Sequence, residues 1–134
     1  PCPPLNAGEI NADGETDLVV GADGYSSSTG RAYIYTFNDS VATGETSSNF
    51  GTSLAVGDFN TDGETDLAVG AYGYSTNTGR AYIFYGDGAN ITASASTADV
   101  TITGNASGDL FGSALTVFYG IKMIDFYFRL VLLG

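Results

Sequence analysis

The chain has little of what most enzymes use for catalysis. Among its 134 residues there is no histidine, one cysteine (Cys2) and only four basic residues. Without histidine the chain supplies no imidazole base and no imidazole metal ligand, and a single cysteine allows no internal disulfide. We therefore predict that the chain has no active site and is not an enzyme.

The shortage of basic residues also limits the partners. The formal net charge is −11, whereas binding to nucleic acid or to an anionic membrane needs clustered Lys and Arg. The composition predicts cations as partners and no nucleic acid. The apolar segment 118–134 contains Lys122, Asp125 and Arg129, which divide it into stretches shorter than the roughly 20 residues of a membrane span. We expect no membrane span.

What the chain has in abundance favours strands and turns. It contains 19 glycines, nine tyrosines and eight phenylalanines, which is typical of an all-β protein with short strands. It begins at Pro1 without a methionine or a secretion signal, so we interpret it as a fragment of a longer protein. Sequons at Asn38, Asn90 and Asn105 fit a secreted glycoprotein.

An internal repeat organises the sequence. When the chain is shifted by 49 positions, residues 8–35 align with residues 57–84, and 20 of these 28 positions are identical. A third copy starts at Phe111, where FGSAL repeats the FGTSL that begins at Phe50. Each copy contains short apolar runs between Gly, Asn, Asp and Ser clusters, about four strands per repeat, which is typical of a blade of a β-propeller.

These patterns predict a partial β-propeller of about two four-stranded blades plus the first strand of a third. The predicted boundaries are 1–49 for blade 1, 50–110 for blade 2, 111–117 for the start of blade 3 and 118–134 for an aberrant apolar tail. For this tail two interpretations remain open, an artefact of the gene model and a terminal segment that covers an open sheet edge.

Each repeat contains one acidic loop that resembles a metal site. The second loop reads DFNTDGETD from Asp58, and the first reads EINADGETD from Glu9. Oxygen side chains at positions one, three and five of a tight loop, followed by glycine, suit a hard cation such as calcium. An EF-hand is excluded because position twelve is valine rather than glutamate. The alternative is a metal-free turn, but several carboxylates about 4 Å apart repel one another by roughly 1 kcal/mol per pair even in water.

The ordered elements Phe50-Gly51, LAVGDFNTDGETDLAVGA and GRAYIFYG resemble the FG-GAP repeat of the integrin α-chain head, over about residues 5–117. The first copy has Pro1-Cys2 in place of the Phe-Gly pair. The resemblance implies propeller blades that bind about two calcium ions through loop residues. The implied ligands are Glu9, Asn11, Asp13, Glu15 through its backbone, and Asp17, and then Asp58, Asn60, Asp62, Glu64 through its backbone, and Asp66.

The function implied by this resemblance is a calcium-binding module of a secreted or cell-surface protein, which serves cell adhesion or binds a protein or glycan. Further blades are expected in the parent chain. The alternative is a non-catalytic propeller region of a secreted hydrolase such as a phospholipase. We interpret the repeated tyrosines as packing between blades, and we expect the repeated Arg31 and Arg80 to pair with a loop acid of their own repeat.

Overall fold

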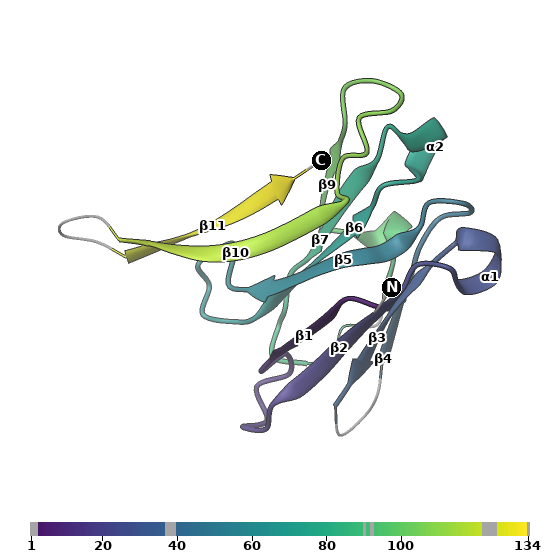
Figure 1. Cartoon of the computed structure of the whole chain (residues 1–134). Coiled ribbons are helices and arrows are strands. Elements are labelled where there is room, and N and C mark those ends of the chain that lie inside the picture. The colour runs from purple at the N-terminus through teal and green to yellow at the C-terminus, as the bar shows by residue number, and fades with distance from the viewer. Residues whose placement is uncertain (1–2, 37–39, 90, 92, 122–125, 134) are drawn as a thin grey trace.

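The computed structural model describes residues 3–36, 40–89, 91, 93–121 and 126–133, with side chains up to residue 117. Two of the predicted sequons, Asn38 and Asn90, lie outside the described residues, as do positions 122–125 of the tail. The chain forms two β-sheets and a β-hairpin that lie next to one another (Figure 1). In the part of the chain that is described, no helix is both long and apolar enough to cross a membrane.

The first sheet, which we call blade 1, is built mainly by the first repeat. Its strands are β1 (Leu5–Gly8), β2 (Asp17–Ala22), β3 (Arg31–Tyr35), β4 (Ser40–Thr43) and β8 (Ala93–Ser94). Strands β1 to β4 form an antiparallel meander. The fifth strand, β8, comes from the long loop of the second repeat and pairs in parallel with β4. The second repeat therefore extends the sheet of the first, which the sequence did not predict.

The second sheet, blade 2, has the four strands expected of a blade. They are β5 (Phe50–Gly57), β6 (Asp66–Ala71), β7 (Arg80–Phe84) and β9 (Val100–Thr103). All of its pairings are antiparallel, and β6 and β7 pair in the same register as β2 and β3 do in blade 1. A short 3₁₀ turn, η1 (Ala95–Thr97), precedes β9. This arrangement confirms the predicted all-β fold of propeller-type blades.

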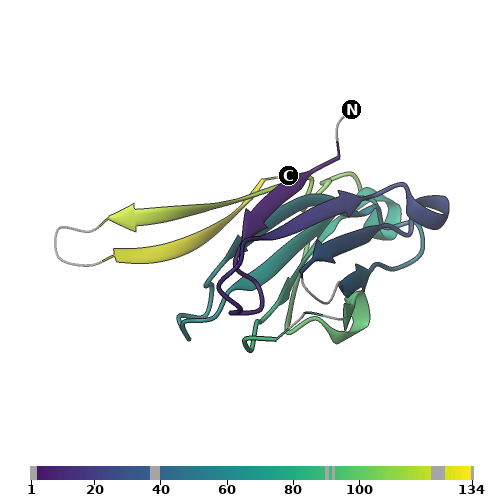
Figure 2. The ribbon, with the colours of Figure 1, turned by 90° about the horizontal axis from the view of Figure 1, so that it is seen from below.

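The third unit is a hairpin of β10 (Ala114–Ile121) and β11 (Phe126–Leu133). Strand β10 continues from the third copy of the repeat into the apolar tail, and β11 pairs along its whole length. Figure 2 shows that this hairpin extends beyond the two blades on one side of the molecule. The start of the third repeat is thus a strand, as expected, and a tail strand completes its hairpin.

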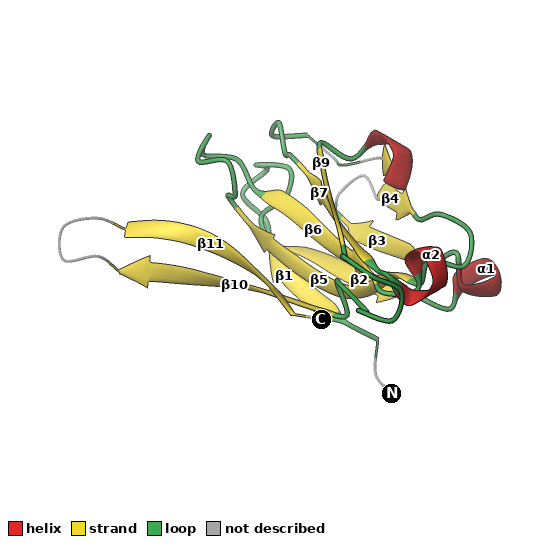
Figure 3. Ribbon diagram, turned by 90° about the horizontal axis from the view of Figure 1, so that it is seen from above, coloured by secondary structure: helices red, strands yellow, loops and turns green. Residues whose placement is uncertain are grey.

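Two short helical turns lie at the end of the blades opposite to the acidic loops (Figure 3). They are α1 (Tyr25–Ser28), between β2 and β3, and α2 (Tyr74–Asn77), between β6 and β7. Each contains residues with positive φ, such as Ser26 and Ser75, so neither is a regular helix. Alternate turns of a meander lie at opposite ends of its strands, which is why the acidic loops and the helical turns are separated.

The main core lies in the seam between the two blades. One face of blade 1 contributes Val19, Ala32 and Ile34, and the facing side of blade 2 contributes a larger apolar set. The members from blade 2 are Leu67, Val69, Ala71, Tyr82 and Phe84. Phe50, the first residue of β5, is fully buried here, with its ring centroid 5.4 Å from that of Tyr82. Tyr82 and Phe84 thus pack between the blades as expected, whereas Tyr25, Tyr35 and Tyr85 are 38%, 48% and 39% exposed, so for these three the expectation is wrong.

Close backbone approach in the seam requires glycine. A Cβ atom on Gly21 would collide with the carbonyl oxygen of Gly51, which begins the next blade. The equivalent Gly70 of blade 2 meets the carbonyl oxygen of Gly112 in the same way. Gly21 and Gly70 thus allow the start of the following repeat to pass directly over the second strand of each blade.

Candidate metal centre

The two acidic loops have equivalent places in the fold. The first joins β1 to β2 and the second joins β5 to β6, each between antiparallel strands whose register is fixed down to the loop. Gly8 pairs with Asp17 at the mouth of the first loop, and Gly57 pairs with Asp66 at the mouth of the second. Because the strands hold both ends of each loop, the eight positions between them have little freedom.

In the second loop the acidic side chains turn inward onto the loop backbone. Asp58 accepts hydrogen bonds from the N–H groups of Asp62 (3.1 Å) and Gly63 (2.9 Å). Asp62 accepts one from the N–H of Glu64 (2.8 Å), and the amide of Asn60 donates to Asp62 Oδ2 (2.8 Å). The side chains at positions one, three and five are therefore held around one turn of backbone.

The first loop repeats most of this pattern. Glu9 accepts a hydrogen bond from the N–H of Asp13 (2.8 Å), and Asp13 accepts one from the N–H of Glu15 (2.8 Å). The amide of Asn11 donates to Asp13 Oδ2 (2.9 Å). The difference is at position one, where Glu9 accepts from the backbone N–H of Asp13, whereas Asp58 accepts from the N–H groups of both Asp62 and Gly63. The longer Glu9 side chain thus gives a less constrained first loop.

The carboxylate at position nine has the same role in both loops, and this role differs from that of positions one, three and five. Asp17 and Asp66 are 2% and 0% exposed, and each accepts a 2.6 Å hydrogen bond from the N–H at position two, that of Ile10 or Phe59. Asp66 also accepts a hydrogen bond from the N–H of Gly86 (2.9 Å), which follows β7. These buried carboxylates tie each loop to the sheet below it.

Burial raises the pKa of the Asp66 carboxyl above its ordinary value of 3.8, and the nearby charge of Asp62 raises it further. The hydrogen bonds from the backbone N–H groups of Gly86, Phe59 and Asn60 act in the opposite direction. Desolvation is the largest effect, because a charged carboxylate removed from water loses its hydration. A positive charge close to Asp66 would therefore favour the ionised form of its carboxyl.

Both loops contain residues in the left-handed region at the same two positions. Position four is Ala12 (φ 58°) or Thr61 (φ 64°), and position six is Gly14 (φ 88°) or Gly63 (φ 92°). Glycine adopts this conformation without cost, whereas a β-branched residue such as threonine is strained there by about 1–2 kcal/mol. The turn is retained in both repeats in spite of this cost, which indicates that its shape matters.

The structure brings together part of the predicted ligand set. In each loop the side chains at positions one, three and five share one turn, while the position-nine carboxylate lies beneath it. Among the described residues, no three acidic or cysteine side chains converge closely enough to form a metal site by themselves. All donors of the loops are oxygens, from carboxylates, an amide and the backbone, and this chemistry fits a hard cation rather than zinc.

Comparison with known families identifies these repeats. The model of the FG-GAP repeat matches residues 5–35 and 50–84, which contain both acidic loops and the two strands that follow each loop. The chain is an FG-GAP repeat protein. No curated protein matches the chain. FG-GAP repeats form propeller-type modules that are typically non-catalytic and are typical of extracellular or cell-surface proteins.

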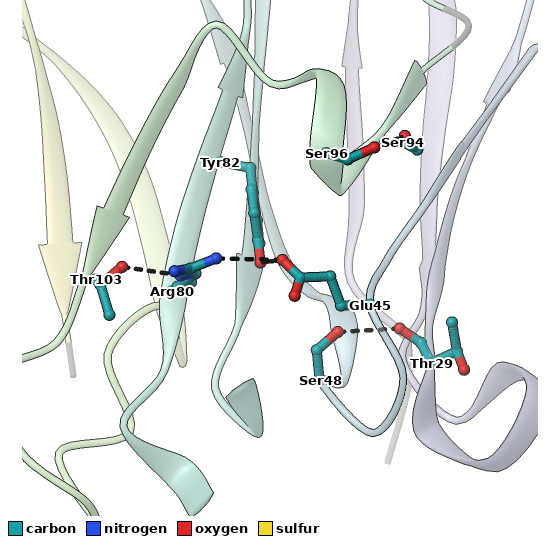
Figure 4. A network of polar contacts seen from close by, with 8 residues as sticks. All are labelled: Thr29, Glu45, Ser48, Arg80, Tyr82, Ser94, Ser96 and Thr103. Carbon is teal, nitrogen blue, oxygen red and sulfur yellow. Dashed lines mark hydrogen bonds and ion pairs between the residues drawn. The ribbon is translucent and has the colours of Figure 1, made fainter. Parts of the chain in front are cut away.

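A second polar group links the two FG-GAP blades, and sequence reasoning missed its central residue. Glu45, in the linker from β4 to β5, forms an ion pair with Arg80 (3.2 Å) and accepts a 2.7 Å hydrogen bond from the hydroxyl of Tyr82 (Figure 4). Arg80 also donates to the hydroxyl of Thr103 and stacks on the ring of Tyr74, 3.7 Å from its centroid.

This contact corrects the expectation that Arg80 pairs with an acid of its own repeat. The carboxylate comes instead from the linker that leaves blade 1, because the seam brings this linker against the start of β7. Burial, and then the hydrogen bond to Glu45, raise the pKa of the Tyr82 hydroxyl well above its ordinary range. A lone glutamate in a polar linker gives no sequence signal for this role. Its separation of 35 positions from Arg80 becomes meaningful only once the seam is known.

Proposed function

We propose that this FG-GAP chain is a calcium-binding β-propeller module of a secreted or cell-surface protein, where it serves cell adhesion or binds a protein or glycan. The observation that carries the proposal is the acidic loop itself. Two loops in equivalent places fold the same oxygen-rich sequence into the same turn, with matching side-chain contacts to the backbone. An ordinary turn needs one or two such groups, whereas each of these loops contains four acidic residues.

In this proposal the ligands are the loop oxygens already described. Asp58, Asn60, Asp62 and Asp66 would hold one ion together with the backbone of Glu64. The equivalent set in the first loop is Glu9, Asn11, Asp13 and Asp17 with the backbone of Glu15. Bound calcium would offset the mutual repulsion of the carboxylates and fix the position of the loop relative to both strands.

Titration calorimetry of the whole chain tests the metal. We expect about two calcium sites and no tight zinc site, because the loops offer neither thiolate nor imidazole. Asp62→Ala should remove the second site and leave the first. Asp87→Asn is the matched control, since Asp87 is an exposed acid outside both loops, and it should leave both sites intact. Tight zinc binding without a calcium response would contradict the proposal.

The difference between the loops gives a sharper test. Glu9→Asp shortens the position-one side chain to the length found in the second loop, so we expect it to tighten the first site. The reciprocal change, Asp58→Glu, should weaken the second site by a similar factor. If Glu9→Asp weakens the first site and Asp58→Glu tightens the second, Glu9 and Asp58 do not have the ligand role assigned to them.

The adhesive role needs a separate measurement. The chain, labelled on Cys2, can be applied to arrays of extracellular matrix proteins and glycans with calcium and with a chelator. We expect retention on a limited set of spots that is lost with the chelator and reduced by Asp62→Ala. Binding that is equal in both conditions, or no binding to any spot, would contradict a calcium-dependent adhesion module.

A further inference from the structure

The two repeats differ most in the segment that follows their third strand. In blade 1, β3 ends at Tyr35 and the next strand begins at Ser40, whereas in blade 2, β7 ends at Phe84 and β9 begins only at Val100. We call residues 85–99 the insertion. It supplies β8 to blade 1, and it also encloses a pocket against the end of β7. None of the described residues that line this pocket belongs to an acidic loop.

The floor of this insertion pocket is apolar. Phe84 at the end of β7 and Ile91 of the insertion are 2% and 8% exposed, and both are part of the main core. Ala93 of β8 completes the floor and is half-buried. The pocket has a volume of about 270 Å³, a little below the roughly 300–1,000 Å³ of sites for small molecules. It therefore has room for a short apolar group and not for an oligosaccharide.

The rim of the insertion pocket is acidic and is held by the backbone. Tyr85, Asp87 and Asp99 are exposed around its mouth. Asp99 Oδ2 accepts a hydrogen bond from the N–H of Tyr85 (2.8 Å), and Asp87 Oδ1 accepts one from the N–H of Ala89 (3.0 Å). These bonds use one oxygen of each carboxylate, and the other oxygen accepts no hydrogen bond from the described part of the chain. The rim thus offers two positioned carboxylates that can each accept from a ligand.

The charge around the pocket has one sign. Arg31 and Arg80, the basic residues whose side chains are described, start β3 and β7 and lie at the other end of these strands. Glu64 of the second acidic loop adds a further carboxylate close to the rim, since its Oε2 would be 3.3 Å from a Cβ atom on Gly88. A concave site lined by one sign of charge raises the local concentration of ions of the opposite sign. The ligand that fits is therefore a cation.

We propose that the insertion pocket binds an organic ammonium group on a short apolar stem. The ammonium group donates to the remaining oxygens of Asp87 and Asp99, next to the ring of Tyr85, and the stem covers Phe84 and Ile91. A free amine and a lysine side chain share this chemistry. The site is separate from the two proposed calcium sites and does not depend on them.

Two other ligands fit the pocket less well. A metal ion would use the carboxylates and gain nothing from the apolar floor, and among the described residues no three acidic or cysteine side chains converge to hold one. A neutral sugar needs donors as well as acceptors, but the hydroxyl of Thr97 already donates to the carbonyl oxygen of Ser94 (3.0 Å) and accepts from its N–H (3.1 Å). An ammonium group brings its own donors, which is what a rim of acceptors requires.

Titration of the whole isotope-labelled chain with n-butylammonium chloride tests the proposal. The backbone amide shifts of Tyr85, Ile91 and Asp99 in two-dimensional NMR spectra report binding at the pocket. Butanol is the neutral analogue with the same stem, and methylammonium is the cation without it. We expect butylammonium to bind at least about fivefold more tightly than either, because only butylammonium satisfies the rim and the floor together. Equal binding of butanol, or no shift at these amides, would overturn the proposal.

Matched variants separate the rim from a general effect of charge. Asp99→Asn keeps an acceptor for the N–H of Tyr85 and removes the charge, so we expect butylammonium to bind about two- to fivefold more weakly. Asp87→Asn should weaken it similarly while both calcium sites remain, which distinguishes this pocket from the acidic loops. Asp23→Asn makes the same change in charge beside α1, at the opposite end of the blades, and should have no effect. Equal effects of Asp23→Asn and Asp99→Asn would contradict a defined site.

The remaining measurements identify the source of the ammonium group and test the other ligands. Tighter binding of Nα-acetyl-lysine amide than of butylammonium would assign the pocket to a side chain of a protein, and the reverse order would assign it to a free amine. All titrations are repeated with a chelator, where butylammonium should bind even if the calcium sites fail. Methyl glucoside that binds as tightly as butylammonium, or a calcium site that is lost in Asp99→Asn, would overturn the proposal.

Discussion

Leu67 and Leu18 are the same residue at the same repeat position in different surroundings. Leu67 of β6 is fully buried in the seam, whereas Leu18 of β2 is 38% exposed on the face of blade 1 that is turned away from the seam. Truncation of a buried leucine to alanine costs about 2–5 kcal/mol, because it removes apolar contacts and leaves a cavity. We expect a loss of this size in the free energy of unfolding for Leu67→Ala, and a clearly smaller loss for Leu18→Ala, since 38% of its surface is already in contact with water.

Urea unfolding measures both losses on one scale. The transition can be followed by tyrosine fluorescence, because the chain has nine tyrosines and no tryptophan, and by circular dichroism. A typical domain has only about 5–15 kcal/mol of stability, so the smaller pair Val69→Ala and Val20→Ala provides a second comparison if Leu67→Ala unfolds the chain. Val69 is fully buried and Val20 is half-buried. Equal losses within about 0.5 kcal/mol for both pairs would refute the conclusion that the seam stabilises the fold.

Three further predictions follow from particular contacts. The pKa of the Tyr82 hydroxyl is raised above its ordinary 10.0 in the folded chain, so the contribution of this hydroxyl to stability is complete below pH 10.0 and is lost as the pH rises through the folded-state pKa. Tyr82→Phe should therefore flatten the fall of the unfolding free energy in this alkaline range, and an unchanged slope would contradict the assignment. Thr61→Gly should stabilise the chain by about 0.5–1 kcal/mol in urea because it relieves a positive φ, whereas Thr65→Gly, at a position without positive φ, should destabilise it. Gly70→Ala should cost more than about 3 kcal/mol, seen as a lower midpoint of urea unfolding, because its Cβ would collide with backbone of the next blade; a neutral effect would show that the blades separate easily.

The repeat made most of the strands predictable from sequence. Apolar runs bounded by Gly and Asp, such as that of β6, are strands in the structure, because propensity, turn residues and pattern agree there. Strand β8 was not predicted. It has only two residues, Ala93 and Ser94, with little β-propensity, and it forms because the loop after β7 passes the free edge of β4.

The acidic loops were located from spacing alone, since Asp, Asn and Gly at alternate positions define a turn locally. The hydrogen bond from the N–H of Gly86 to Asp66 could not be predicted from sequence, because the two residues are 20 positions apart and meet only across the sheet. The different burial of Leu18 and Leu67 was equally hidden. Their flanking sequences are nearly identical, and only the presence or absence of a neighbouring blade distinguishes them.

The seam combines two kinds of contact that act differently. Apolar burial by Val, Ile, Ala and Leu is strong but non-directional, so by itself it does little to fix the register of the blades. The close approach of Gly21 to the carbonyl oxygen of Gly51 does constrain it, because the neighbours of Gly21 have a Cβ atom that would collide there. The contact of Glu45 with Arg80 and Tyr82 is directional, because the carboxylate must meet a guanidinium and a hydroxyl that lie two residues apart on β7. Its ion pair is partly exposed and adds little free energy. A shift of one residue would nevertheless leave the buried hydroxyl of Tyr82 without its acceptor, which costs about 1–3 kcal/mol. We infer that burial provides the stability of the seam and that Glu45, together with the close approach at Gly21, fixes its register.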